Sequence, residues 1–296
     1  KSKGAVLSTT IDKYIYISNH PYFHKDRFLL KYSKTEEVSS RSEISHPLIR
    51  LAAQKANILS GVEFSSSADV PSGTGLGSSS SFTVGCLHCF SEYNNKAMNK
   101  DDLANLACSI EIEELGEPIG KQDQYAAAYG GINLIEFYSN DKVKVSSIKL
   151  KINTKELLEN NLICFYVGGS RSASKILKEQ AVLDSKKEKI QNRMVELVYE
   201  SKEAIENNDL DKFGTLLHSN WILKKQLSNG ISNSVIDNIY DTGIENGALG
   251  GKLLGAGGTG FMLFYCPQEK QKKLKQSLKN LSQLNFKFDV EGSKVI

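Results

Sequence analysis

The stretch that decides the fold is Asp69-Val70-Pro71-Ser72-Gly73-Thr74-Gly75-Leu76-Gly77-Ser78-Ser79-Ser80-Ser81. Its three alternate glycines let the backbone turn tightly and bring N–H groups close to a ligand. Val62 and Phe64 predict a strand before it, and apolar residues at helical spacing from Phe82 predict a helix after it. A strand, a glycine loop and a helix N-terminus form an anion site, because free N–H groups and the positive end of the helix dipole point at the ligand. We therefore expect this loop to bind phosphate.

Two common phosphate loops do not match this stretch. It lacks the Gly-Lys-Ser/Thr of a Walker A loop. Its GxGxG spacing and the serines that follow do not fit the dinucleotide fingerprint, which needs close helix–strand packing. The plain alternative is a surface turn rich in serine and glycine, but the helical pattern directly after it argues against a flexible linker.

Composition limits the class of protein. The chain has 296 residues, of which 40% are hydrophobic, and a net charge of +3. This fits one large domain or two packed ones, with no basic tract for nucleic acid and no run long enough to span a membrane. Five cysteines without a disulfide spacing pattern favour a reducing, cytoplasmic location. Cys86-Leu87-His88-Cys89 reads as CxxC, but we expect both cysteines to pack in the helix after the loop.

An acidic helix follows. Residues 101–116 predict a helix that Asn99 or Asp101 could cap, and Glu111 and Glu114 continue toward its apolar face. An inward carboxylate is costly unless it is paired or bound to a cation. The alternative is a solvated acidic helix end, and periodicity alone does not choose between the two glutamates.

Asp123 enters a segment of small residues that ends at Gly130-Gly131. An aspartate in such a tight apolar setting would be held rigidly and partly dried, which suits a base or an anchor for a substrate hydroxyl. Alternatively, Asp123 caps the short helix after it. The residues alone leave these two alternatives about even.

The second half of the chain predicts strands within 132–152, a boundary within 153–161 and a buried strand over 162–167. Ser170-Arg171 opens a helical region that could bind a second anion or carry an ordinary cap. We expect Trp221 in the core, and Lys224 and Lys225 are more often solvated than phosphate ligands. The glycine run 247–260 precedes a strand over 261–265 and implies backbone close to a ligand or to another loop.

Three segments resemble the GHMP small-molecule kinases. Pro71 to Ser79 match P-x-x-x-G-L-G-S-S at every fixed position, and Gly116 to Gln124 match G-x-P-x-G-x-x-D-Q. Lys252 to Gly260 match K-x-x-G-A-G-G-G-G, with Thr259 in place of one glycine. The resemblance implies an α+β, two-domain GHMP kinase fold. We expect an N-terminal α/β nucleotide-binding domain over residues 1–156 and a C-terminal ferredoxin-like α+β domain over 157–296.

Within that family, segments 120–128, 169–173, 231–233 and 247–252 look like those of the kinases that phosphorylate the anomeric hydroxyl of D-glycero-D-manno-heptose 7-phosphate. A fucokinase or another sugar 1-kinase is the nearest alternative. The implied partners are ATP and a small-molecule sugar phosphate, and a homodimer is possible.

The resemblance also implies roles for single residues. Asp123 becomes the catalytic base, and the glutamate five residues before Gly116, which is Glu111, would hold Mg²⁺ with Ser79. Arg171, Lys175 and Lys225 are candidates for the distal phosphate of the sugar. The residues expected to bind ATP are Pro71, Gly73, Gly75, Leu76, Gly77, Ser78, Ser79, Ser80, Gly257 and Gly258.

One departure concerns the family's first motif, a basic residue followed by Gly-Gly-Gly-Thr-Asp, which should lie immediately before Gly4 and is absent. Either an N-terminal segment precedes this sequence, or the protein is an impaired kinase that regulates by binding nucleotide. The start at Lys1 and the abrupt entry into a strand favour the first explanation.

Overall fold

The structure is a computed structural model that describes residues 3–169, 176–177 and 184–296. The chain forms two compact units, each assembled from separated segments. Unit 1 comprises residues 1–9, 72–76 and 132–288, and unit 2 comprises residues 10–71, 77–131 and 289–296. The predicted domains 1–156 and 157–296 stay a prediction.

Unit 2 contains one mixed four-stranded sheet in the order β2-β5-β3-β4. Its strands are β2 (Ile15–Pro21), β3 (Phe28–Lys31), β4 (Thr35–Val38) and β5 (Val62–Ala68). Only the β3–β5 pair is parallel, and β5 leads directly toward the phosphate loop. The strand that Val62 and Phe64 predict before the loop is therefore confirmed.

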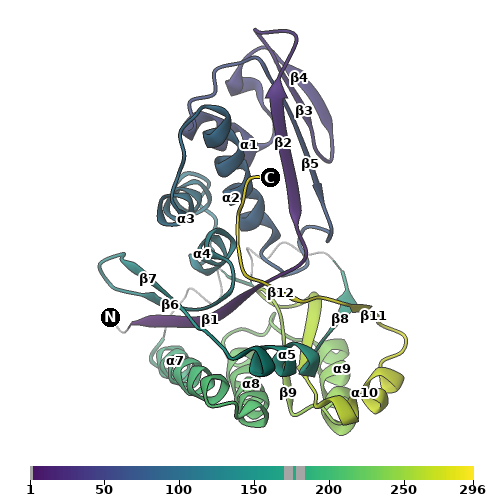
Figure 1. Cartoon of the computed structure of the whole chain (residues 1–296). Helices are drawn as coiled ribbons and strands as arrows, with labels where there is room; N and C mark the ends of the chain where they lie inside the picture. The colour runs from purple at the N-terminus through teal and green to yellow at the C-terminus, as the bar shows by residue number, and fades with distance from the viewer. Residues whose placement is uncertain (1–2, 170–175, 178–183) are drawn as a thin grey trace. The chain divides into compact units, whose positions relative to one another are not determined.

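Helices α1 to α4 gather on one side of this sheet (Figure 1). They are α1 (Pro47–Lys55), α2 (Ser78–Tyr93), α3 (Lys100–Cys108) and α4 (Gln122–Tyr129), and a π-helical turn, η2 (Ser109–Glu114), extends α3. Phe64 of β5 and Phe90 of α2 are fully buried, with ring centroids 5.4 Å apart. Burying each such side chain contributes about 1.5–3 kcal/mol, so this pair fixes the helix after the loop against the strand before it.

The first sheet of unit 1 has the order β12-β1-β6-β7. Its strands are β1 (Gly4–Ile11), β6 (Ile132–Phe137), β7 (Val143–Ser147) and β12 (Phe288–Asp289). β1 and β6 are antiparallel, in a register that pairs Gly4 with Phe137 and Thr9 with Ile132. Helix α5 (Ile152–Asn161) then leads into the second sheet.

The second sheet of unit 1 is antiparallel, in the order β11-β8-β10-β9. The chain passes through β8 (Leu162–Gly168), helices α7 (Ser185–Glu206), α8 (Leu210–Lys225) and α9 (Ser234–Glu245), β9 (Gly250–Leu253), β10 (Gly260–Tyr265), α10 (Gln271–Ser277) and β11 (Ser282–Leu284). A strand, helices, two adjacent strands, a helix and a strand give the ferredoxin-like order, as predicted. Trp221 lies fully buried in the core beneath this sheet, also as predicted.

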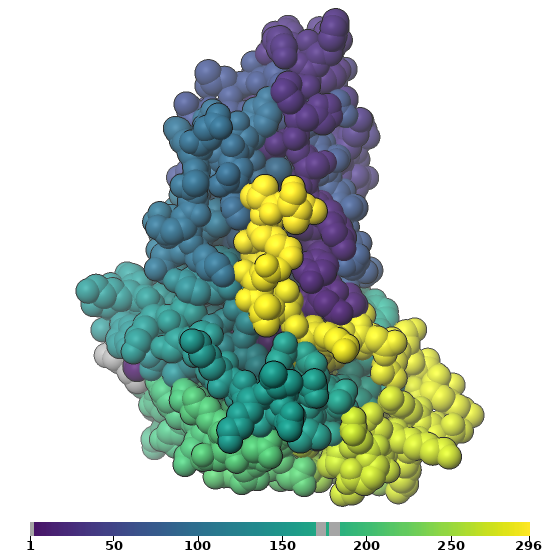
Figure 2. All heavy atoms as spheres, in the orientation of Figure 1, coloured from purple at the N-terminus to yellow at the C-terminus, as the bar shows by residue number. Residues whose placement is uncertain are grey.

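The last residues return to unit 2 and lie on its surface (Figure 2, yellow). The Ser293 N–H donates to the Ala127 carbonyl oxygen at 2.9 Å, and Lys100 Nζ donates to the Glu291 carbonyl oxygen at 3.0 Å. Residues 289–296 are therefore hydrogen-bonded to α4 and to Lys100, the first residue of α3. No helix in the described ranges is long and apolar enough to cross a bilayer.

Candidate active site

The phosphate loop has the backbone that its glycines predict. Gly73, Gly75 and Gly77 have φ of 75°, 84° and 72°, values that favour glycine. Gly77 is the N-cap of α2, so no cap side chain accepts a hydrogen bond from the N–H groups of the first helical turn. These donors and the helix dipole point toward the loop, where an anion is stabilised.

Within unit 1, the loop residues Thr74 and Gly75 pack against the glycine run 247–260. A Cβ placed on Gly75 would lie 2.7 Å from the Leu254 carbonyl oxygen, and one on Gly255 would lie 2.5 Å from Gly75 Cα. A Cβ on Gly260 would lie 2.2 Å from the Thr74 carbonyl oxygen. Of the two alternatives for this run, close approach to another loop is therefore confirmed.

Two further residues, Ile231 and Lys224, contact the glycine run. The Gly258 N–H donates to the Ile231 carbonyl oxygen at 3.0 Å, and a Cβ on Gly257 would lie 2.6 Å from Ile231 Cα. Lys224 Nζ donates to the Gly255 carbonyl oxygen at 2.6 Å, a contact that sequence reasoning did not predict. Gly257 and Gly258, the part of the run predicted to bind ATP, thus lie against the backbone of Ile231.

Ser79 and Glu111 meet in unit 2. Ser79 Oγ donates to Glu111 Oε1 at 2.6 Å, and only 1% of Glu111 is exposed. Glu114 instead forms an ion pair with Lys55 at 2.5 Å. The alternative of a solvated acidic helix end is thus wrong for Glu111, and the carboxylate that resemblance selected is the buried one.

The donor set around Glu111 fits a magnesium ion. Mg²⁺ prefers oxygen ligands and usually combines one or two protein ligands with water and substrate phosphates. A serine hydroxyl and a buried carboxylate at the start of the phosphate-loop helix offer that chemistry. Within the described residues no group of three or more His, Cys, Asp and Glu side chains gathers, so any metal here would depend on nucleotide oxygens as well.

Asp123 lies in the first turn of α4 but does not cap it, because the N-cap is Lys121. Its side chain is exposed, so the expectation of a partly dried setting is wrong. The side chain instead lies against the phosphate loop: a Cβ on Gly77 would be 3.5 Å from Asp123 Cγ. The structure thereby brings the predicted base to the start of α2.

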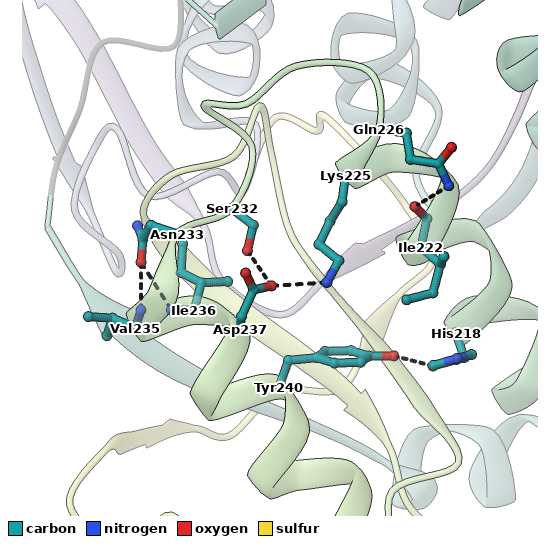
Figure 3. Close-up of polar contacts among 10 residues, drawn as sticks. All are labelled: His218, Ile222, Lys225, Gln226, Ser232, Asn233, Val235, Ile236, Asp237 and Tyr240. Atoms are coloured by element: carbon teal, nitrogen blue, oxygen red, sulfur yellow. Dashed lines mark hydrogen bonds and ion pairs between the residues drawn. The ribbon is translucent and has the colours of Figure 1, made fainter. Parts of the chain in front are cut away.

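Of the three candidates for the sugar phosphate, Arg171 and Lys175 fall outside the described residues. Lys225 Nζ forms an ion pair with Asp237 Oδ1 at 3.0 Å, and Ser232 Oγ donates to the same oxygen at 2.9 Å (Figure 3). Lys225 therefore already has an anionic partner that a phosphate would have to displace.

The cysteines of the CxxC segment lie on α2, as predicted, and all five cysteines are free. Burial raises the pKa of Cys86 well above its usual value and that of Cys89 to about 11. Both thiols are therefore protonated and unreactive at neutral pH, which suits packing.

Gln124 is a residue of this site whose contact sequence reasoning did not predict. It is fully buried, and its Nε2 donates to Glu111 Oε2 at 2.6 Å. The signal in the sequence is its place in α4, where Gln124, Tyr125 and Ala128 form the buried face. A glutamine on the buried face of a helix needs a polar partner, and a predicted inward glutamate was available.

Comparison with known proteins gives the family. The GHMP kinase N-terminal domain matches residues 44–131 and the GHMP kinase C-terminal domain matches residues 201–283. A D-glycero-alpha-D-manno-heptose 7-phosphate kinase of Campylobacter jejuni is 36% identical over 77% of this chain and 68% of that protein. A bifunctional fucokinase/GDP-fucose pyrophosphorylase of Arabidopsis thaliana is 26% identical over 74% of this chain, but the match spans only 21% of that protein.

A crystal structure of a D-glycero-D-manno-heptose 1-phosphate kinase from Bacteroides thetaiotaomicron superposes with a TM-score of 0.81 and 25% identity, covering 99% of this chain and 91% of that one. The N- and C-terminal domain matches, the three sequence motifs and the shared fold all indicate the same family. The chain therefore belongs to the GHMP kinases and is an ATP-dependent phosphotransferase.

Proposed function

We propose that this kinase phosphorylates the anomeric hydroxyl of D-glycero-D-manno-heptose 7-phosphate to give the 1,7-bisphosphate. The observation that carries the proposal is the 36% identity to the Campylobacter jejuni kinase named for that substrate. The segments around Asp123 that suggested a heptose phosphate kinase from sequence point the same way.

In the proposed mechanism the loop from Gly73 to Ser81 binds the ATP phosphates through backbone N–H groups. Ser79 and Glu111 would hold Mg²⁺, which neutralises charge on the β- and γ-phosphates. The Ser79–Glu111 contact at 2.6 Å supports a shared role for these two oxygens.

Asp123 orients the anomeric hydroxyl and accepts its proton as the hydroxyl oxygen attacks the γ-phosphorus, while ADP leaves. Phosphoryl transfer depends mainly on positioning and charge stabilisation, so the base need not be strong. The position of Asp123 beside Gly77, at the start of the loop helix, supports this role.

Arg171, Lys175 and Lys225 remain the proposed contacts for the distal phosphate. Lys225 would have to exchange Asp237 for the phosphate, which weakens its candidacy. Arg171 suits the role better, because a guanidinium can bind a phosphate through two hydrogen bonds.

The test is incubation of the protein with Mg-ATP and a panel of sugars and sugar phosphates, followed by ³¹P NMR. We expect a new anomeric phosphate signal with the heptose 7-phosphate and little with galactose, fucose or mevalonate. A preference for free fucose would favour the fucokinase-like alternative, to which the Arabidopsis relative points. ATP binding without turnover of any sugar would indicate a nucleotide-binding regulator.

A further inference from the structure

Each oxygen of the Glu111 carboxylate has a different partner in unit 2. Oε1 accepts from Ser79 Oγ, at the start of the phosphate-loop helix, and Oε2 accepts from Gln124 Nε2, both at 2.6 Å. Gln124 is 0% exposed and Glu111 is 1% exposed, so water does not compete for the second contact. Hydrogen bonds from a buried amide to an ionised carboxylate are among the strong ones.

The orientation of the Gln124 amide depends on that contact. Its Oε1 is buried and has no hydrogen-bond partner among the described residues. Turning the amide over would place this oxygen against the carboxylate, where two acceptors repel each other. The amide oxygen is therefore left without a partner among the described residues, and the nitrogen faces Glu111.

The backbone conformation at Glu111 also favours a hydrogen bond that orients its carboxylate. Glu111 lies in η2, where the regular hydrogen bonding of α3 gives way to a wider π-helical turn. Such turns recur at functional sites and place side chains where a regular helix would not. A carboxylate on this turn gains a fixed direction from a partner on a different helix, and α4 supplies that partner.

We propose that Gln124 is a positioning residue for the metal, which rests on the proposed role of Glu111. By holding Oε2, Gln124 fixes the carboxylate so that Oε1, the oxygen beside Ser79, is the one available to the metal. In this role Gln124 acts through Glu111, to which its Nε2 donates, rather than as a ligand of the metal itself. The same helix carries Asp123, so Gln124 also ties the helix of the proposed base to the carboxylate of the metal site.

The experiment measures metal binding directly. Mn²⁺ replaces Mg²⁺, and its dissociation constant is determined by electron paramagnetic resonance with a non-hydrolysable ATP analogue present. We expect Gln124→Met, which keeps the size and removes the donor, to weaken Mn²⁺ binding about 10- to 100-fold, the range typical of lost partners of metal ligands. Gln124→Asn, whose amide is one methylene too short to reach Glu111, should weaken it as well and serves if the methionine variant does not fold.

The matched control is Tyr125→Phe. Tyr125 follows Gln124 on α4, is 2% exposed and donates a hydrogen bond of the same length, 2.6 Å, to Asn105. Its loss should lower thermal stability while Mn²⁺ affinity stays at the wild-type value. Equal losses of Mn²⁺ affinity in Gln124→Met and Tyr125→Phe would mean that α4 packing alone is responsible, and the proposal would be overturned.

Glu111→Gln separates this proposal from the one on which it rests. If Glu111→Gln binds Mn²⁺ like the wild type, the metal role of Glu111 is wrong and the role of Gln124 falls with it. If Glu111→Gln loses affinity while Gln124→Met and Gln124→Asn, both folded, keep it, the metal site stands and only the positioning role is overturned.

Discussion

Replacing Gly260 by alanine should displace the phosphate loop, because Gly260 contacts this loop although it lies far from it in the sequence. A Cβ at Gly260 would lie 2.2 Å from the Thr74 carbonyl oxygen, whereas ordinary contacts begin at 3.4 Å. The loop or the strand must therefore move by the difference, 3.4 − 2.2 = 1.2 Å. Gly260 also has a φ of 112°, and an alanine held in such a region costs about 1–3 kcal/mol of stability.

A shift of this size reaches the proposed ATP contacts directly, because Thr74 lies between Gly73 and Gly75 in the loop. Misplacing a reacting group by about 1 Å costs on the order of 10²-fold in rate. That loss corresponds to about 2.7 kcal/mol of transition-state stabilisation. We expect kcat/KM for ATP to fall by this factor in a coupled ADP-release assay, with weaker binding of a fluorescent ATP analogue.

Gly168→Ala is the matched control, since Gly168 pairs with Gly260 across β8 and β10. Its φ is 91°, so alanine is strained there too, but a Cβ would meet no heavy atom of the described residues within 4 Å. Gly168→Ala should lose stability and keep its affinity for ATP. A folded Gly260→Ala enzyme with wild-type ATP binding and turnover would refute the idea that this contact sets the loop geometry.

Four other outcomes are expected. Asp123→Asn should lower kcat about 10²–10⁴-fold with an unchanged circular dichroism spectrum, and turnover within a few-fold of wild type would exclude Asp123 as the base. In Gly130→Ala the new Cβ would lie 2.0 Å from Gly292 N at a φ of 68°, so the free energy of unfolding should fall by about 1–3 kcal/mol and residues 289–296 should exchange amide hydrogens faster; normal protection would contradict this. Hydrogen bonds from Lys3 and then Tyr199 lower the pKa of Glu136. That stabilisation is present above the ordinary glutamate pKa and is lost as pH falls through the folded value, so a Tyr199→Phe variant should be destabilised most at neutral pH and approach wild type in acid-unfolding curves. Burial raises the pKa of all five cysteine thiols, so Ellman's reagent should react slowly with the native protein and with five thiols after unfolding.

The phosphate loop and the strand over residues 162–167 could be predicted because their signals are local or periodic, whereas the ferredoxin-like order of the C-terminal half was expected only from the family resemblance. Alternate glycines before a helical pattern specify a turn whatever the rest of the chain does. The strand predicted over residues 162–167 matches β8, which spans Leu162–Gly168. Predictions of this kind use only residues that lie close together in the sequence.

The choice between Glu111 and Glu114 could not be made from periodicity, and the structure supplies the reason. The predicted helix over residues 101–116 is regular throughout, with Asn99 or Asp101 as its cap. Asn99 does cap α3, but the helix changes to a π-helical turn at Ser109. A π turn holds more residues than an α turn, so the later residues leave the register of the α3 face. Glu114 consequently reaches Lys55 at the surface instead of the interior.

A positive φ alone does not identify the glycines that matter to the site. Gly116 has a φ of 67°, yet a Cβ there would meet nothing within 4 Å of the described residues. Gly75 has a similar φ of 84°, but a Cβ would meet the Leu254 carbonyl oxygen at 2.7 Å. Both glycines satisfy a local turn, and only the second also admits backbone from a distant part of the sequence. The close approach at Gly75 depends on tertiary structure. In the sequence, its only sign is the second glycine run, which lies far from Gly75 along the chain.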